Sequence, residues 1–159
     1  MFLKVDGARS GPITGEAQDS KHKNEIEVLA WSWGMQGKPS LGGGGASGKS
    51  TIRELRITKR VDKASTALMS ALRTNEPIKQ ATLTIRKIGK TPLEYLTIKI
   101  EDGRVMSLEI EAGDASNAPA LLERVSFSFN RITVDYTPQG PDGNPLGGTS
   151  FMDEWTTAG

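Results

Sequence analysis

The sequence contains no cysteine, which excludes disulfides, thiolate metal sites and cysteine nucleophiles. It has one histidine, so a metal site built from several histidines is excluded as well. No apolar run is long enough to span a membrane, and residues 1–6 lack the apolar stretch of a secretory signal. We therefore expect a protein made in the cytoplasm that, if it leaves, needs no cleaved signal peptide.

Neither sign of charge is in excess. Lys and Arg number 20 and Asp and Glu number 19, a formal net charge of +1. A dedicated nucleic-acid-binding protein usually shows a basic excess, so we expect no nucleic-acid partner. Near-neutral charge also lets identical subunits approach without strong repulsion. The length of 159 residues predicts a single domain, residues 1–159.

Most of the chain alternates apolar and polar residues at period two, which is typical of strands. Such segments occupy residues 26–33, 55–61, 81–86, 96–100, 105–110 and 124–137. In residues 81–86 the odd positions are apolar, and in residues 96–100 the even ones are. In residues 105–110 we expect Leu108 and Ile110 to point inward. In residues 124–137 the apolar residues move from odd to even positions. This requires a bulge or bend, which we place near Asn130–Arg131.

One segment predicts a helix, over about residues 64–74, because its apolar residues form a single stripe. Pro77 prevents a longer helix. Many strands and one helix predict a mainly β fold, an antiparallel barrel or sandwich. We expect an extended glycine-rich loop over residues 34–50 and a flexible, Pro/Gly-rich C-terminal tail from about residue 138.

The glycine-rich loop contains the letters of a phosphate loop, with Gly43, Gly48, Lys49 and Ser50 in the fixed positions. A true phosphate loop runs directly from a buried strand into a helix. Here residues 51–58 favour a strand, which supplies no helix dipole for the phosphate charge. We interpret the motif as a decoy and expect no nucleotide cofactor.

Two other features have chemical potential. His22 lies in a polar stretch that we expect to be exposed, and its neighbours Asp19 and Ser20 are too close in sequence to form a catalytic triad readily. Trp31 and Trp33 share one face of a strand with Leu29. They can serve as a stacking platform, although core or interface packing is favoured.

Several segments occur in an order typical of one family. They are Gly15–Gly34, the glycine-rich loop, Thr58–Lys63, Ala81–Lys87, Val125–Phe129 and Val134–Gln139. Together they resemble the Hcp proteins, the tube subunits of bacterial type VI secretion, and the resemblance covers nearly the whole chain.

The resemblance implies a two-sheet β-barrel with one helix, assembled into hexameric rings with a wide pore. The rings stack into a tube inside a contractile sheath, and contraction drives the tube and its spike toward a target cell. The implied partners are copies of the chain, sheath and spike proteins, and effectors in the pore. No enzymatic activity, catalytic residue, cofactor, metal or membrane insertion is implied.

The resemblance also assigns roles to residues. Ser32 matches a position expected to face the pore. The loop over residues 38–49 matches one that contacts the adjacent ring, with Lys38, Leu41, Gly42, Gly43, Gly44, Gly45 and Lys49 as candidates. Family members often carry a branched apolar residue where Asp102–Gly103 stands, and this pair instead predicts a tight hairpin turn or a bulge.

Two alternatives from other classes remain open at this stage. One is a nucleotide-binding protein that uses the phosphate-loop letters. The other is a small β-barrel that binds carbohydrate or nucleic acid through Trp31 and Trp33. A strand–loop–helix unit would support the first, and exposed tryptophans would support the second.

Overall fold

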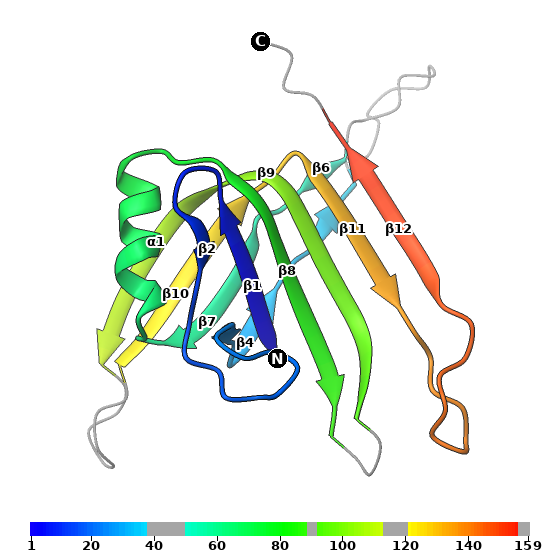
Figure 1. Cartoon of the computed structure of the whole chain (residues 1–159). Coiled ribbons are helices and arrows are strands. Elements are labelled where there is room, and N and C mark those ends of the chain that lie inside the picture. Colours follow the sequence, from blue (N-terminus) through cyan, green and yellow to red (C-terminus); the bar gives the residue numbers. More distant parts are fainter. Residues whose placement is uncertain (38–49, 89–91, 113–120, 156–159) are drawn as a thin grey trace, which may run out of the picture.

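A computed structural model of the chain describes residues 1–37, 50–88, 92–112 and 121–155. These residues form a helix, α1 (Ala64–Arg73), and a set of antiparallel strands (Figure 1). The strands are β1 (Phe2–Gly7), β2 (Gly11–Ile13), β3 (Ile26–Glu27), β4 (Ala30–Ser32), β5 (Met35–Gln36), β6 (Thr51–Ile52), β7 (Leu55–Arg60), β8 (Ile78–Lys87), β9 (Leu93–Ala112), β10 (Leu121–Ser128), β11 (Arg131–Tyr136) and β12 (Thr149–Glu154).

The strands form two connected layers. Sheet A has the order β2-β1-β8-β9-β11-β12, and β3 also pairs with β1. Sheet B has the order β9-β10-β7-β4. The long strand β9 belongs to both, because it pairs with β8 as far as Gly103 and with β10 from Arg104 onward. Figure 1 shows this strand curving from one layer into the other.

Asp102–Gly103 lies inside β9, at the point where the strand passes between the sheets, so a hairpin turn there is wrong. Asp102 has a left-handed φ of 51°, the kind of local irregularity that bends a strand. A Cβ on Gly103 would collide with the backbone carbonyl oxygen of Ser128. Glycine is therefore required here because the backbones of β9 and β10 approach closely.

Residues 26–33 do not form the single strand that the sequence predicted. β3 pairs with β1 and β4 pairs with β7, and between them Val28 donates to the carbonyl of Met1 while Leu29 donates to that of Thr58. This segment therefore crosses from sheet A to sheet B. The predicted two-sheet antiparallel fold with one helix is confirmed, although the paired strands do not form one closed ladder.

The core lies between the two sheets and α1. Its apolar side chains follow the predicted alternation on β8, β9 and β10. The predicted parity change is confirmed, because β10 ends at Ser128 in sheet B and β11 begins at Arg131 in sheet A. Fully or almost fully buried members include Leu3, Leu55, Ile57, Leu68, Ala81, Leu83, Ile98, Ile100, Val125, Phe127 and Ile132.

Helix α1 ends one residue before the predicted limit. Asn75 follows it with a left-handed φ of 53°, and Pro77 prevents continuation. The Glu76 carboxylate then turns back to the β1–β2 turn, where it accepts hydrogen bonds from the backbone N–H groups of Arg9 (2.7 Å) and Ser10 (2.6 Å). The end of the helix is thus fixed to sheet A.

We predicted a flexible C-terminal tail from about residue 138, and this prediction is wrong for residues 149–154. Residues 149–154 form β12, which pairs with β11 along its whole length. Between the two strands, Gln139 and Pro145 form an isolated bridge. The Pro/Gly-rich passage is therefore the connection between two strands of sheet A.

Candidate functional site

The outward face of sheet B carries the residue expected to face a pore. Ser32 is exposed on β4, as is Ala30, in agreement with the predicted small-residue face. Because side chains alternate along a strand, the cross-strand pairs define two outward rows. These rows are Ser32–Arg56–Ser126–Ser107 and Ala30–Thr58–Arg124–Glu109.

These rows line a shallow hollow of about 500 Å³. In its floor the hydroxyls of Ser107 and Ser126 are hydrogen-bonded, with 2.5 Å between the oxygens. At one side the guanidinium of Arg124 forms an ion pair with Glu111, and the nitrogen and oxygen lie 2.5 Å apart. The hollow is therefore polar, with small hydroxyl side chains below and charged side chains above.

Trp31 and Trp33 point the other way. Both are partly buried and pack against the hydrophobic core. The favoured interpretation, packing, is confirmed, and this orientation argues against a stacking platform for sugars or bases.

At one edge of sheet A the end of an apolar row is exposed. Leu3, Leu83, Ile98, Val134 and Phe151 are successive cross-strand partners, so they lie on the same, core-facing side of the sheet. The first three are buried, the fourth is partly buried, and the last, on the edge strand β12, is 41 % exposed. Strand β12 of sheet A therefore lies beyond the edge of the hydrophobic core.

Sheet B extends past the core at its opposite end. Lys59, Glu123 and Ile110 are cross-strand partners on the core-facing side. The first two are fully buried, whereas Ile110, on β9, is 43 % exposed. Its predicted inward direction is right, but the described residues cover it only in part. In Figure 1 this end of β9 lies on the left and β12 on the right.

Comparison with known proteins identifies the family. The profile described as "Type VI secretion system effector, Hcp" matches residues 2–136. The chain belongs to the Hcp family. This confirms the predicted membership and the structural role in type VI secretion that accompanies it.

Individual relatives agree with this assignment. The chain is 40 % identical to the protein hcp1 of Pseudomonas aeruginosa, over 93 % of this chain and 89 % of that one. A crystal structure of a type VI secretion system effector from Yersinia pestis is 32 % identical, with a TM-score of 0.75 over 97 % of this chain and 98 % of that one. Hcp1 of Salmonella typhimurium is 29 % identical, with a TM-score of 0.70 over 95 % of both chains.

The glycine loop of this Hcp chain lies mostly outside the described residues, including all the ring-contact candidates from Lys38 to Lys49 and the motif residues Gly43 and Gly48. Ser50 is described, and β6 follows it directly. β6 pairs with β5, so strands precede and follow the loop. The predicted strand after the motif is present, where a phosphate loop needs a helix.

His22 is not exposed, contrary to the expectation from its polar neighbours. Its side chain is almost buried, and the ring stacks on Phe2 with 4.6 Å between the centroids. Nδ1 lies 2.9 Å from the Glu25 carboxylate, and Nε2 contacts that of Glu94 on β9. The ring of His22 therefore joins the loop before β3 to sheet A through the carboxylates of Glu25 and Glu94.

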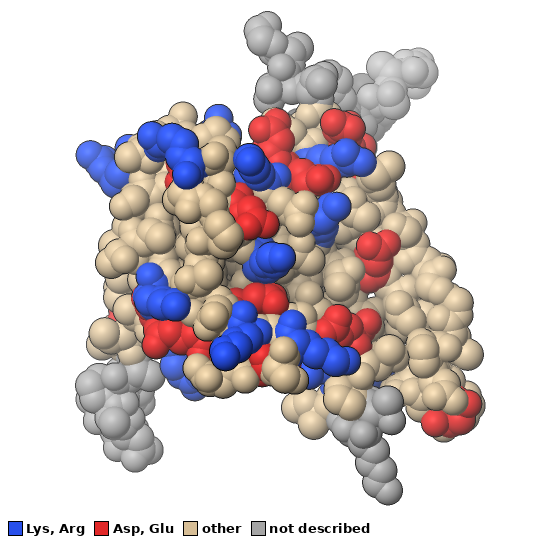
Figure 2. Space-filling model, viewed as in Figure 1, with Lys and Arg blue, Asp and Glu red and all other residues tan. Residues whose placement is uncertain are grey.

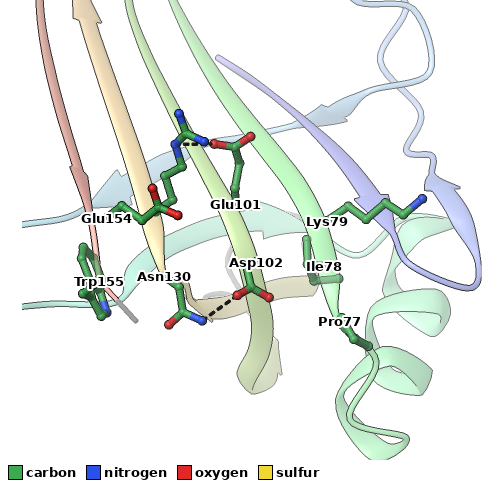
Figure 3. A pocket seen from close by; sticks show the side chains of 9 residues that line it. Pro77, Ile78, Lys79, Glu101, Asp102, Asn130, Glu154 and Trp155 are labelled. Carbon is green, nitrogen blue, oxygen red and sulfur yellow. Dashed lines mark hydrogen bonds and ion pairs between the residues drawn. The ribbon is translucent and has the colours of Figure 1, made fainter. Parts of the chain in front are cut away.

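Two hollows lie at opposite ends of sheet A. The upper one, about 510 Å³, lies where β8 begins and β12 ends, at the top of the sheet in Figure 1. Figure 3 draws its walls, which include Glu101, Asp102 and Glu154, with Lys79 and Arg131 beside them, and Trp155. The lower one, about 460 Å³, is lined by Met1, Phe2, Arg86, Lys87, Ile88 and Pro92. Figure 2 shows that the outward face between them carries both signs of charge intermixed.

The described residues include no helix long and apolar enough to cross a membrane. Within the same parts of the chain, no group of three or more His, Asp or Glu residues is arranged to hold a metal ion.

Proposed function

We propose that this chain forms closed hexameric rings that stack into the inner tube of a type VI secretion apparatus. The observation that carries the proposal is the pair of partly exposed flanks, Phe151 on β12 and Ile110 on β9. A surface on one side of a molecule that meets a different surface on the other side produces head-to-tail association, which closes into a ring when the rotation permits.

Unpaired strand edges and exposed apolar side chains on the two flanks both support ring formation. β12 pairs only with β11, and residues 104–112 of β9 pair only with β10, so each flank ends in an unpaired strand edge among the described residues. Such edges readily pair with another chain. Other exposed apolar side chains lie on the same edges of the sheets, Met152 on β12, Met106 on β9 and Leu121 on the neighbouring β10. Burying these residues against a neighbouring copy would remove apolar surface from water.

The mass of the purified protein by light scattering tests the ring. We expect six chains for the natural sequence and a shift to monomers for Phe151→Glu or Ile110→Glu, because each places a charge in the contact. Lys4→Glu, on the exposed outward side of β1, is the control and should retain the ring mass. A natural protein that stays monomeric at all concentrations would contradict the proposal.

For the stacking of rings, the support comes from the two ends of sheet A. The lower end has the fully exposed Ile88 with Arg86 and Lys87, whereas the upper end has an acidic excess of one, with Glu101, Asp102 and Glu154 against Lys79 and Arg131. Apolar surface and opposite charge at the two ends favour head-to-tail contact along the strands. We expect Lys87→Glu to shorten or abolish tubes in electron micrographs without changing the ring mass, and Glu154→Lys in the same chain to restore them in part.

We further propose that the outward face of sheet B lines the pore and that the ring carries effector proteins there, with sheath and spike proteins as its other partners. The support is the position of Ser32 in a polar hollow on that face. The role needs no covalent chemistry, and we propose that the chain is not an enzyme.

A further inference from the structure

The charges on the outward face of sheet B are not distributed evenly. Glu109 and Glu111 point outward from β9, and Arg56 points outward from β7, with β10 between them. Two strand spacings separate β7 from β9, about 10 Å. Arg124 on β10 stands between the two groups and is bound to Glu111. The acidic side of the face is thus partly neutralised by Arg124.

Arg56 has no such partner within the described part of the chain. It is exposed, and no carboxylate of residues 1–37, 50–88, 92–112 or 121–155 lies within ion-pair distance of its guanidinium. Its cross-strand neighbours, Ser32 on β4 and Ser126 on β10, have short side chains. The guanidinium therefore stands above its neighbours with its donors free.

The described residues around Arg56 supply no excess of negative charge to neutralise it. In the adjoining hollow, Arg53 and Glu54 contribute one charge of each sign. Arg60, farther along β7, lies in a separate hollow beside Glu27 and Asp62. Counted together, Arg53, Glu54 and Arg56 leave one excess positive charge here, and Arg104, in register with Ser128 on the same outward face, adds another.

We propose that this hollow selects cargo that presents carboxylate groups, and that Arg56 is the residue that determines this preference. The inference rests on the proposed function, because it names the class of protein surface that the pore would hold. A guanidinium offers a planar pair of donors that matches a carboxylate, and the Ser32 hydroxyl beside it adds another donor. The occupant is an acidic segment of an effector.

In a ring, several weak ion pairs can together hold the cargo. An exposed ion pair contributes little by itself. In a hexamer, however, Arg56 occurs once per subunit around the pore, so a cargo with several carboxylates engages several copies at once, and linked weak contacts multiply in affinity. Such contacts release readily when salt or dilution weakens each one.

Binding of labelled peptides to the assembled protein tests the proposal by fluorescence anisotropy. The probes are a deca-glutamate and a deca-lysine peptide at low salt. We expect the glutamate peptide to bind and to weaken as salt rises. Arg56→Gln should weaken it at least tenfold, and Arg56→Glu should reverse the preference toward lysine. Lys4→Gln, on the outward face of sheet A, should leave binding unchanged.

The outcomes separate this inference from the proposed function. Preferential binding of deca-lysine by the natural protein, binding of neither peptide, or equal loss in Lys4→Gln and Arg56→Gln would overturn the carboxylate preference. Light scattering on the same samples reports the ring independently. A monomeric mass would contradict the ring, while the peptide preference of that monomer would still decide the charge selectivity of the hollow.

Discussion

Lys59 and Glu123 face each other across β7 and β10 inside the protein, with 3.4 Å between Nζ and Oε1, and neither side chain reaches solvent. The ammonium also lies 2.9 Å from Asp62 and donates to the Ser65 hydroxyl, 3.1 Å away. No described group donates a hydrogen bond to the Glu123 carboxylate. Through Asp62 and Ser65 the ammonium links the start of α1 to sheet B, and Glu123 depends on Lys59 for its counter-charge.

Removing one member should be costly. We expect Lys59→Met to lower the free energy of unfolding by about 3–5 kcal/mol, because it leaves Glu123 buried without a compensating charge. The double change Lys59→Met with Glu123→Leu should recover most of the loss, since a buried ion pair is often no better than apolar residues of similar volume. Urea unfolding at one fixed protein concentration measures both.

Lys79→Met is the matched control for that series. Lys79 is exposed on β8, and a surface change of this kind usually alters stability by no more than about 0.5 kcal/mol. A Lys59→Met protein as stable as the control would show that the buried pair contributes nothing.

Stability at acid pH should depend on Glu76. Burial disfavours its charge, but the hydrogen bonds from Ser10 and Arg9 outweigh this and hold the pKa of the carboxyl below its ordinary value of 4.5. Because the folded pKa is the lower one, the contribution is complete above 4.5 and is lost as pH falls through the folded value. We expect Glu76→Gln to cost about 1–3 kcal/mol at neutral pH.

The pH series supplies the check on Glu76. The difference in unfolding free energy between Glu76→Gln and the natural protein should shrink progressively as pH falls below 4.5. Glu109→Gln, an exposed change on β9, should show no comparable trend. A penalty for Glu76→Gln that stays constant with pH would contradict an ionised role.

Gly103 should not tolerate a side chain. Gly103→Ala would bring the new methyl group into the carbonyl oxygen of Ser128, and backbone atoms cannot move aside as a side chain end does. We expect a loss of about 1–3 kcal/mol in urea unfolding, as in other overpacked sites. Gly147→Ala meets nothing within 4 Å and should be nearly neutral, so equal losses would contradict the close approach of β9 and β10.

The phosphate-loop motif should not bind nucleotide. We expect Lys49→Ala to leave the ring mass and the thermal unfolding midpoint unchanged, and calorimetric titration with ATP to give no heat of binding for either protein. ATP binding by the natural protein that Lys49→Ala abolishes would revive the nucleotide alternative. The present reason for expecting none is that β6, not a helix, follows Ser50.

Local patterns predicted some of the site and not the rest. Ser32 and Ala30 were expected on one face because alternation along a strand is a local property, and both are exposed there. Arg56 was not singled out, since its importance depends on which strands flank β7. His22 was expected to be exposed, because its partner Glu94 is 72 residues away and no local pattern reveals it.

The sequence by itself determined the strand alternation, the single helix, the break near Asn130–Arg131 and the family, because periodicity and the order of motifs are properties of neighbouring residues. Only the tertiary structure decided that residues 26–33 cross between two sheets, that β9 bends at Asp102–Gly103, and that residues 149–154 add an edge strand. These features depend on pairing between distant segments, where backbone hydrogen bonds and burial outweigh local preference. The same pairing leaves Phe151 and Ile110 partly exposed on opposite flanks.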